Sequence, residues 1–429
     1  MNIEATTAEQ WPGAPGRKVS KSSAQNGGGS GFWQVGHKPT LIAAFLYFDV
    51  AFMVWVLLGP LGPEIAATLG LTPAQKGLMV AMPTISGAIL RIINGLLVDR
   101  IGPKRAGAIG QIIVIAGLLF AYGTGVNSFA GTLALGVLLG FAGASFAVAL
   151  PLASRWYPGE HQGKAMGIAG MGNSGTVLAS LFAPMLAALF GWNAVLGLAC
   201  IPLTIVFLLY MILTRDAPGA PARQSLSAYL EPLRAADTWW FMFFYAVTFG
   251  GFVGLTASLS LYFTDQFGLS AIVAGYCTAG CVFAGSLVRP LGGALADRIG
   301  GIRTLSCAYV LAAAALVGVS MTPDSLALAL GLFVVAMLAL GTGNGAVFQL
   351  VPQRFRAEIG VMTGLVGFAG GVGGFYLSSS LGAARQFTGS YQAGFLLFAA
   401  IAMVALAGLS RVKGRWRAGW GAAIDGVRI

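Results

Sequence analysis

Apolar and polar positions occur in long blocks along this chain. Apolar runs of about 18 to 25 residues, the length that a bilayer requires, are separated by short polar segments. Such runs are too long and too continuous for the strands of a barrel, whereas a helix satisfies its own backbone in lipid. The pattern predicts an all-α integral membrane protein with twelve transmembrane helices, at residues 40–62, 77–98, 105–125, 130–153, 164–189, 193–213, 239–263, 271–295, 304–320, 325–350, 360–384 and 391–411.

The basic residues indicate how these helices cross the membrane. With the N-terminus placed in the cytoplasm, 21 Lys and Arg residues fall in cytoplasmic segments, and only Lys76 and Arg385 fall at the outer side. This asymmetry follows the positive-inside rule. We therefore expect a multi-pass protein of the cell inner (plasma) membrane with both termini in the cytoplasm. No apolar stretch precedes the first predicted helix, so we expect no cleaved signal peptide.

Composition excludes several other classes of protein. The chain is 57% apolar and only 9% charged, whereas soluble domains carry about 25% charged residues. The net charge of +11 is spread between the apolar runs and not gathered on one face, so no nucleic-acid partner is expected. The two histidines, His37 and His161, lie in predicted cytoplasmic segments, and the four cysteines form no metal-ligand pattern. We expect no enzyme activity, no metal and no cofactor.

The chain repeats itself at an interval of 198 residues. The segment GLLVDRIGPKR at 95–105 matches GGALADRIGGIR at 292–303. Two parallel six-helix halves explain this offset, and the plan and its loop motif resemble the major facilitator superfamily. The four charged loop residues are predicted to lock the cytoplasmic loops and gate the inward-closed state: Asp99, Arg105, Asp297 and Arg303. The predicted organisation is a polar tail at 1–39 with a disordered Ser/Gly-rich stretch, a six-helix bundle at 40–213, a linker at 214–238, a second bundle at 239–411 and a basic tail at 412–429.

Arg91 and Arg289 occupy equivalent places in the two repeats. Arg91 lies about eight residues inside its predicted helix, or about 12 Å at 1.5 Å per residue. A charge at this depth costs about 2.5 kcal/mol or more. Each arginine could snorkel or pair with a structural carboxylate. The symmetry favours a cationic pocket at the interface of the repeats, because planar guanidinium groups bind planar oxyanions through paired hydrogen bonds.

Two glycine runs lie beside these arginines. AGMGNSGT contains Gly170, Gly172 and Gly175 at the spacing of a dinucleotide fingerprint, but that motif requires a preceding strand, and here the run lies inside an apolar helix. The second run, GLVGFAGGVGGF, begins at residue 364, and Gly172 and Gly370 are again 198 residues apart. Tight helix packing explains part of this pattern. Glycine also lets the backbone approach a substrate closely.

Together, these motifs resemble the nitrate/nitrite porter family of the major facilitators, over all twelve predicted helices. AGMGNSG and GFAGGVGGF match its paired signature motifs. The resemblance implies substrate binding by Arg91 and Arg289, with pocket aromatics Phe146, Tyr245 and Phe249, the polar residue Asn173, and the glycines Gly172, Gly175, Gly370 and Gly371. Taken singly, the three aromatic residues are also typical of a membrane-protein core.

Asp49 is the remaining charge inside a predicted span. One hypothesis is that it couples transport to protons. The other is that it is a structural partner of Arg91 or forms a hydrogen bond between helices. Asn344 and Gln349 lie at a depth that faces the pore, without an assigned role.

The predicted function is secondary active transport of nitrate or nitrite by alternating access, by a monomer in the lipid bilayer. Three alternatives stay open: symport with protons, nitrate/nitrite exchange without protons, and transport of a small organic anion on the same fold. The last would be expected to have a larger pocket and often a lysine.

Overall fold

The computed structural model is all-helical over the residues that it describes. These are residues 32–157, 159–218, 227, 230–321, 324–355 and 359–420, with the backbone alone at 159–164. Twelve helices in this part of the chain are long and apolar enough to cross a membrane, which confirms the predicted fold class. Most of the tail 1–39, part of the linker 214–238 and residues 421–429 lie outside the described residues, so the predicted division into five segments stays a prediction.

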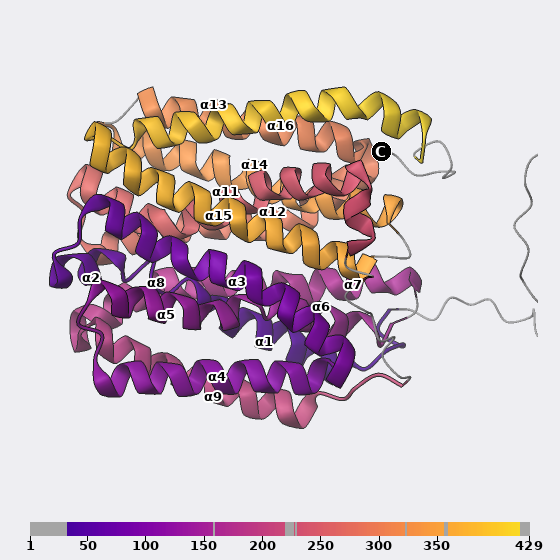
Figure 1. The fold of residues 1–429 in the computed structure, drawn as a ribbon, viewed down its shortest axis with the longest axis horizontal. Coiled ribbons are helices and arrows are strands. Elements are labelled where there is room, and N and C mark those ends of the chain that lie inside the picture. The colour runs from indigo at the N-terminus through magenta and orange to yellow at the C-terminus, as the bar shows by residue number, and fades with distance from the viewer. Residues whose placement is uncertain are drawn as a thin grey trace, which may run out of the picture. The chain divides into compact units, whose positions relative to one another are not determined.

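Figure 1 shows the helices in the order in which they follow one another along the chain. The first part of the chain forms α1 (Lys38–Trp55), α2 (Gly62–Leu69), α3 (Pro73–Ile101), α4 (Pro103–Thr124), α5 (Phe129–Gly143), α6 (Phe146–Ser154), α7 (Gly159–Gly170), the 3₁₀ helix η1 (Met171–Ser174), α8 (Gly175–Phe190) and α9 (Trp192–Leu213). The second part forms the 3₁₀ helix η2 (Pro232–Arg234), α11 (Ala236–Phe267), α12 (Ala271–Ile299), α13 (Gly301–Met321), α14 (Leu326–Arg354), α15 (Ile359–Thr388) and α16 (Gln392–Ala418).

Three predicted spans are not single uninterrupted helices. The first ends at Trp55, and a separate short helix, α2, begins at Gly62. The fourth is broken between α5 and α6, and the fifth is interrupted by η1. The sequences at the two internal breaks, Gly-Ala-Ser at 143–145 and Met-Gly-Asn-Ser at 171–174, contain residues of low helix propensity. The sequence had suggested that the first signature motif lies inside one continuous helix. In the structure, the motif lies partly in the 3₁₀ helix η1.

The helix α15 packs against both α3 and α11 and so joins the two repeats. Glycines make these approaches close. A Cβ atom placed on Gly77 of α3 would lie 2.8 Å from the Cα of Gly382 on α15, and one on Gly250 of α11 would lie 2.7 Å from the Cα of Gly373. Because real Cβ atoms do not approach other atoms so closely, larger side chains would push the helices apart.

We define the terminal end of the bundle as the end where α1 begins and α16 ends, and the distal end as the opposite one. At the distal end an ion pair crosses between the repeats. Lys76 of α3 lies 2.9 Å from a carboxylate oxygen of Asp265 on α11. The hydroxyl of Tyr391 donates to the same carboxylate at 2.8 Å. This network stabilises contact between α3 and α11 at the distal end.

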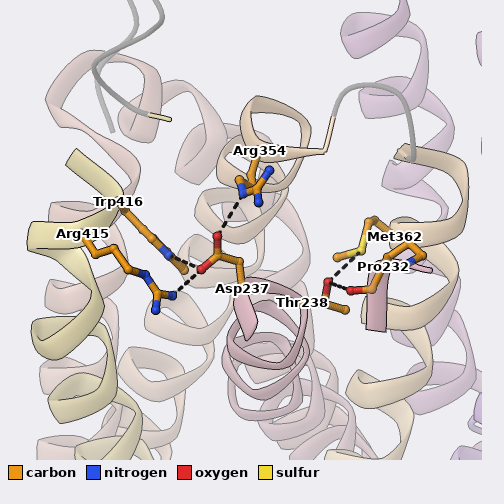
Figure 2. Close-up of polar contacts among 7 residues, drawn as sticks. All are labelled: Pro232, Asp237, Thr238, Arg354, Met362, Arg415 and Trp416. Atoms are coloured by element: carbon orange, nitrogen blue, oxygen red, sulfur yellow. Dashed lines mark hydrogen bonds and ion pairs between the residues drawn. The ribbon is translucent and has the colours of Figure 1, made fainter. Parts of the chain in front are cut away.

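At the terminal end, a single carboxylate joins three helices of the second repeat (Figure 2). Asp237, near the start of α11, accepts hydrogen bonds from Arg354 Nε at 2.9 Å, from Arg415 Nη2 at 2.5 Å and from Trp416 Nε1 at 2.8 Å. The Trp416 ring also stacks on Phe241, with ring centroids 4.8 Å apart. Asp237 therefore connects α11 to the ends of α14 and α16.

We predict that Asp237→Asn lowers the free energy of unfolding by about 1–2 kcal/mol. Breaking a buried ion pair costs about 3–5 kcal/mol, but the side chains of Arg354 and Arg415 are 36% and 57% exposed, so solvent screens part of this loss. The measurement is thermal unfolding of the protein in detergent. Asp324→Asn, at an exposed carboxylate, is the matched control. Equal melting temperatures for the two variants would contradict the role given to Asp237.

Candidate anion-binding site

Arg91 is buried in the interior of the bundle, with 2% of its surface exposed. Its Nε donates to the carbonyl oxygen of Gly143 at 3.0 Å, and its Nη1 donates to the carbonyl oxygen of Gly367 at 2.7 Å. Its Nη2 is buried and has no acceptor among the described residues. Because an unpaired buried donor costs free energy, Nη2 marks a position where an acceptor from outside the chain would fit.

The break between α5 and α6 supplies one of the carbonyl groups that hold Arg91. The amide of Ala147 donates to the carbonyl of Ala144 at 3.1 Å, one residue short of the α-helical bond to Gly143. The side chain of Asn94, about one turn after Arg91 on α3, donates to Ala144 at 3.3 Å. The break thus leaves the carbonyl of Gly143 without its α-helical donor, so it can accept from Arg91 on α3, while the carbonyl of Ala144 accepts from both Ala147 and Asn94.

Arg289 is half-buried on α12 and has a different set of partners. Its Nη2 donates to the hydroxyl of Tyr245 on α11 at 3.2 Å. Its Nη1 is buried without an acceptor in the described part of the chain. Each of the two arginines therefore keeps one buried guanidinium nitrogen that can still donate to an anion.

The ring of Phe249 lies near both cations. Its centroid is 5.3 Å from Cζ of Arg91 and 5.9 Å from Cζ of Arg289. The Phe146 ring contacts Arg91 at 5.6 Å, and Tyr245 stacks on Phe249 with ring centroids 5.0 Å apart. The residues predicted from the sequence, Arg91, Arg289, Phe146, Tyr245 and Phe249, are therefore brought together. They form a cationic site with aromatic walls.

Asp49 and Asn173 lie where α1 meets η1. The carboxylate of Asp49 accepts a hydrogen bond from the hydroxyl of Ser174 at 2.6 Å. Within the described residues Asp49 forms no ion pair with Arg91, so of the two structural roles considered for it, the hydrogen bond between helices is the one observed. Asn173 is 2% exposed, and its Oδ1 has no donor among the described residues.

Comparison with known proteins places this site in a family. Residues 42–378 match the family model of the Major Facilitator Superfamily. A probable nitrate/nitrite transporter of Mycobacterium tuberculosis, NarK2, is 34% identical over 86% of this chain and 95% of its own length. The nitrite extrusion protein of Bacillus subtilis is 33% identical over 82% of this chain and 88% of its own length. The chain belongs to the nitrate/nitrite porter family of the major facilitator superfamily.

A further relative also matches most of this chain, and a solved structure has a similar fold. A probable nitrate/nitrite antiporter of Thermus thermophilus, NarK1, is 30% identical over 84% of this chain and 88% of its own length. Among solved structures, a bacterial homologue of the human lysosomal transporter Spinster superposes with a TM-score of 0.67. It is 20% identical and covers 87% of this chain and 96% of its own, so it supports the fold alone.

The glycines of the porter's signature motifs contact neighbouring helices. A Cβ atom on Gly172 would lie 2.8 Å from the amide nitrogen of Asp49, and one on Gly175 would collide with the Asp49 carbonyl oxygen. A Cβ atom on Gly370 would lie 2.7 Å from the Phe249 ring, and one on Gly371 would lie 2.8 Å from the carbonyl oxygen of Thr84. Glycine is needed at these four positions because the neighbouring helices pack too closely for a larger side chain. Contact of the same glycines with the substrate stays a prediction.

The four charged loop residues of the porter have different surroundings. Asp99 accepts a hydrogen bond from Arg155 at 3.0 Å, which joins the end of α3 to the residue after α6. Arg105, Asp297 and Arg303 are exposed. Their predicted role in gating stays a prediction.

Sequence reasoning did not identify two aromatic residues of the site. The ring of Phe348 lies 5.8 Å from Cζ of Arg289 and 5.0 Å from the ring of Tyr245. The ring of Trp55 lies 5.0 Å from Cζ of Arg91. Phe348 follows Asn344 by one helical turn, so the polar residue on α14 was a usable signal for it. Trp55 lies in an uninterrupted apolar run with no such signal.

We predict that Gly370→Ala lowers the affinity for nitrate. The added methyl group would lie 2.7 Å from Phe249 and 2.8 Å from Tyr245, so both rings must change their position beside the arginines. Overpacking of this kind costs about 1–3 kcal/mol. Gly360→Ala is the control on the same helix, because a Cβ atom there meets nothing within 4 Å. The measurement is the rise in melting temperature with added nitrate. If nitrate raised the melting temperature of both variants equally, the close contact of Gly370 with Phe249 and Tyr245 would have no role in nitrate binding.

Proposed function

We propose that this protein is a secondary active transporter of nitrate and nitrite across the cell inner membrane, with Arg91 and Arg289 binding the anion. The observation that carries this proposal is the pair of guanidinium groups near the Phe249 ring, each with one buried nitrogen that has no acceptor among the described residues. The named functions of the relatives in Mycobacterium tuberculosis and Bacillus subtilis point to the same substrates.

The chemistry of the site favours a small planar anion of single charge. Guanidinium donors lie in one plane and match the in-plane oxygens of nitrate or nitrite. Aromatic walls supply no hydrogen bonds to a second negative charge, so sulfate and phosphate would lose hydration without compensation. The organic-anion alternative has less support, because the contacts of Arg91 and Arg289 include no lysine among the described residues.

The proposal includes alternating access, which is supported by the helices that carry the two arginines. Arg91 lies on α3 of the first repeat and Arg289 on α12 of the second. An anion that binds both nitrogens would draw the repeats together at the site. In the present conformation, Arg91 is already linked across the repeats by its hydrogen bond to Gly367 of α15, so this bond and the ion pair of Lys76 with Asp265 would change when the distal end opens.

We predict that proteoliposomes containing this protein take up labelled nitrate by counterflow, and that Arg91→Lys and Arg289→Lys each reduce uptake at least about 100-fold. Lysine keeps the charge but loses the planar set of donors. Nitrite should compete with labelled nitrate, and excess sulfate should not. Retention of the parent melting temperature shows that the variants are folded. Near-parental uptake by either variant, or strong competition by sulfate, would overturn the assignment of the site.

Asp49 is the candidate for coupling to protons. The residue is 8% exposed, and its carboxylate accepts a hydrogen bond from the hydroxyl of Ser174, next to Asn173 in η1. Gain of a proton would change this hydrogen bond and could thereby alter the placement of η1 against α1. Inward movement of nitrate against a negative-inside potential costs about 2.3 kcal/mol per 100 mV. Two protons that move with it would reverse the net charge carried.

We predict that Asp49→Asn abolishes nitrate accumulation driven by an inward pH gradient and leaves counterflow intact, because asparagine keeps the shape without the titratable proton. The measurement is nitrate uptake into proteoliposomes with an imposed pH gradient, with Asp324→Asn as the control. Accumulation by Asp49→Asn at the parental level would remove Asp49 as the coupling group. A parent protein that ignores the pH gradient and responds to internal nitrite would instead be an exchanger.

A further inference from the structure

Trp55 fills a slot between α3 and α5. It is the last residue of α1 and is 0% exposed. Its Nε1 donates to the carbonyl oxygen of Pro83 on α3 at 2.7 Å. The ring contacts Gly87 and Gly143, and a Cβ atom on Gly87 would lie 3.0 Å from Nε1. The hydrogen bond and the two glycines together fix the plane of the indole.

This fixed ring covers Arg91. Cζ of Arg91 lies 5.0 Å from the indole centroid, the shortest of the three distances between this arginine and an aromatic ring, ahead of Phe249 and Phe146. Cation–π attraction acts within about 6 Å of a ring centroid and is strongest for tryptophan. Trp55 is therefore the aromatic residue best placed to stabilise the buried cation.

An aromatic neighbour has a property that a carboxylate lacks. A carboxylate would neutralise Arg91 and would occupy its donors. An aromatic ring attracts the cation through its quadrupole, and it leaves both the net positive charge and the unpaired Nη2 available to an anion. Within the described residues Arg91 has no ion-pair partner, so its charge is stabilised by rings and by the carbonyls of Gly143 and Gly367.

The Trp55 ring also contacts the residue whose carbonyl oxygen holds Arg91. Gly143 contacts the Trp55 indole, and its carbonyl oxygen accepts the hydrogen bond from Arg91 Nε. A change in the size of the side chain at position 55 would therefore act on the guanidinium in two ways, through the lost ring face and through the last turn of α5. Arg289 has no equivalent arrangement, because residue 253, which is 198 residues after Trp55, is a valine.

We propose that Trp55 is a positioning residue of the anion site, which holds the guanidinium of Arg91 charged and oriented so that Nη2 binds the anion. This inference rests on the proposed transport of nitrate. It adds a residue of α1 to the binding site and assigns it a role in affinity for the anion rather than in the stability of the fold alone.

The test compares Trp55→Leu with Trp55→Phe. Leucine keeps apolar bulk and removes the π face, and phenylalanine keeps a π face and removes the indole N–H. We expect Trp55→Leu to raise the Kd for nitrate and the KM for uptake by about tenfold, and Trp55→Phe to restore both to within about threefold of the parent. The maximal uptake rate should change less than KM. Equilibrium dialysis with ion chromatography measures Kd on protein in detergent, without relying on tryptophan fluorescence.

Phe333→Leu is the control for loss of a buried aromatic residue, because Phe333 is 0% exposed and packs against Tyr262, Phe263 and Phe395. Its Kd should equal that of the parent. If Trp55→Leu cannot be purified as a folded protein, Trp55→Met supplies the same comparison. Parental affinity in the leucine or methionine variant, or equal losses with leucine and phenylalanine, would overturn the role of the π face. A parent protein that binds no nitrate would instead overturn the proposed function and this inference with it.

Discussion

The arrangement of the site depends on keeping a guanidinium group charged inside an apolar bundle without a carboxylate beside it. A buried cation of this kind is costly, and a direct counter-ion would remove the positive charge that an anion needs. Arg91 meets this constraint with backbone carbonyls and aromatic rings. These groups stabilise the cation while leaving its net charge, and the donor Nη2, unused within the described residues.

The irregular backbone of the first repeat follows from the same constraint. A continuous α-helix uses its carbonyl oxygens internally, so the carbonyl of Gly143 is available to Arg91 only because α5 ends there. Irregular backbone at membrane depth is tolerated where protein surrounds it. Close helix packing then covers the break, since Gly143 meets the Trp55 indole.

Much of this could be predicted from the sequence, because some of its signals are strong and local. Apolar length identified all twelve spans, and the repeat placed Arg91 and Arg289 in equivalent helices. Phe249 came from the family resemblance. The break at 144–145 was not predicted, because Gly-Ala-Ser is also common in continuous membrane helices that pack closely. Trp55 was missed because an aromatic residue in an apolar run has the same pattern whether it faces lipid or an arginine. The bond from Ser174 to Asp49 depends on η1, a departure from helical geometry that periodicity does not reveal.

The two repeats have diverged around a conserved pair of charges. α14 and α15 are continuous where their counterparts in the first repeat are interrupted, and Phe146 corresponds to Asn344 at an offset of 198 residues. Tyr47 and Tyr245 are also 198 residues apart, yet Tyr245 accepts from Arg289 while the hydroxyl of Tyr47 bonds to the backbone of Gly107. Both arginines lie near aromatic rings, but the first donates to two backbone carbonyls and the second donates to a phenol hydroxyl. The two guanidinium groups are therefore held by different kinds of acceptor, backbone carbonyls for Arg91 and a side-chain hydroxyl for Arg289.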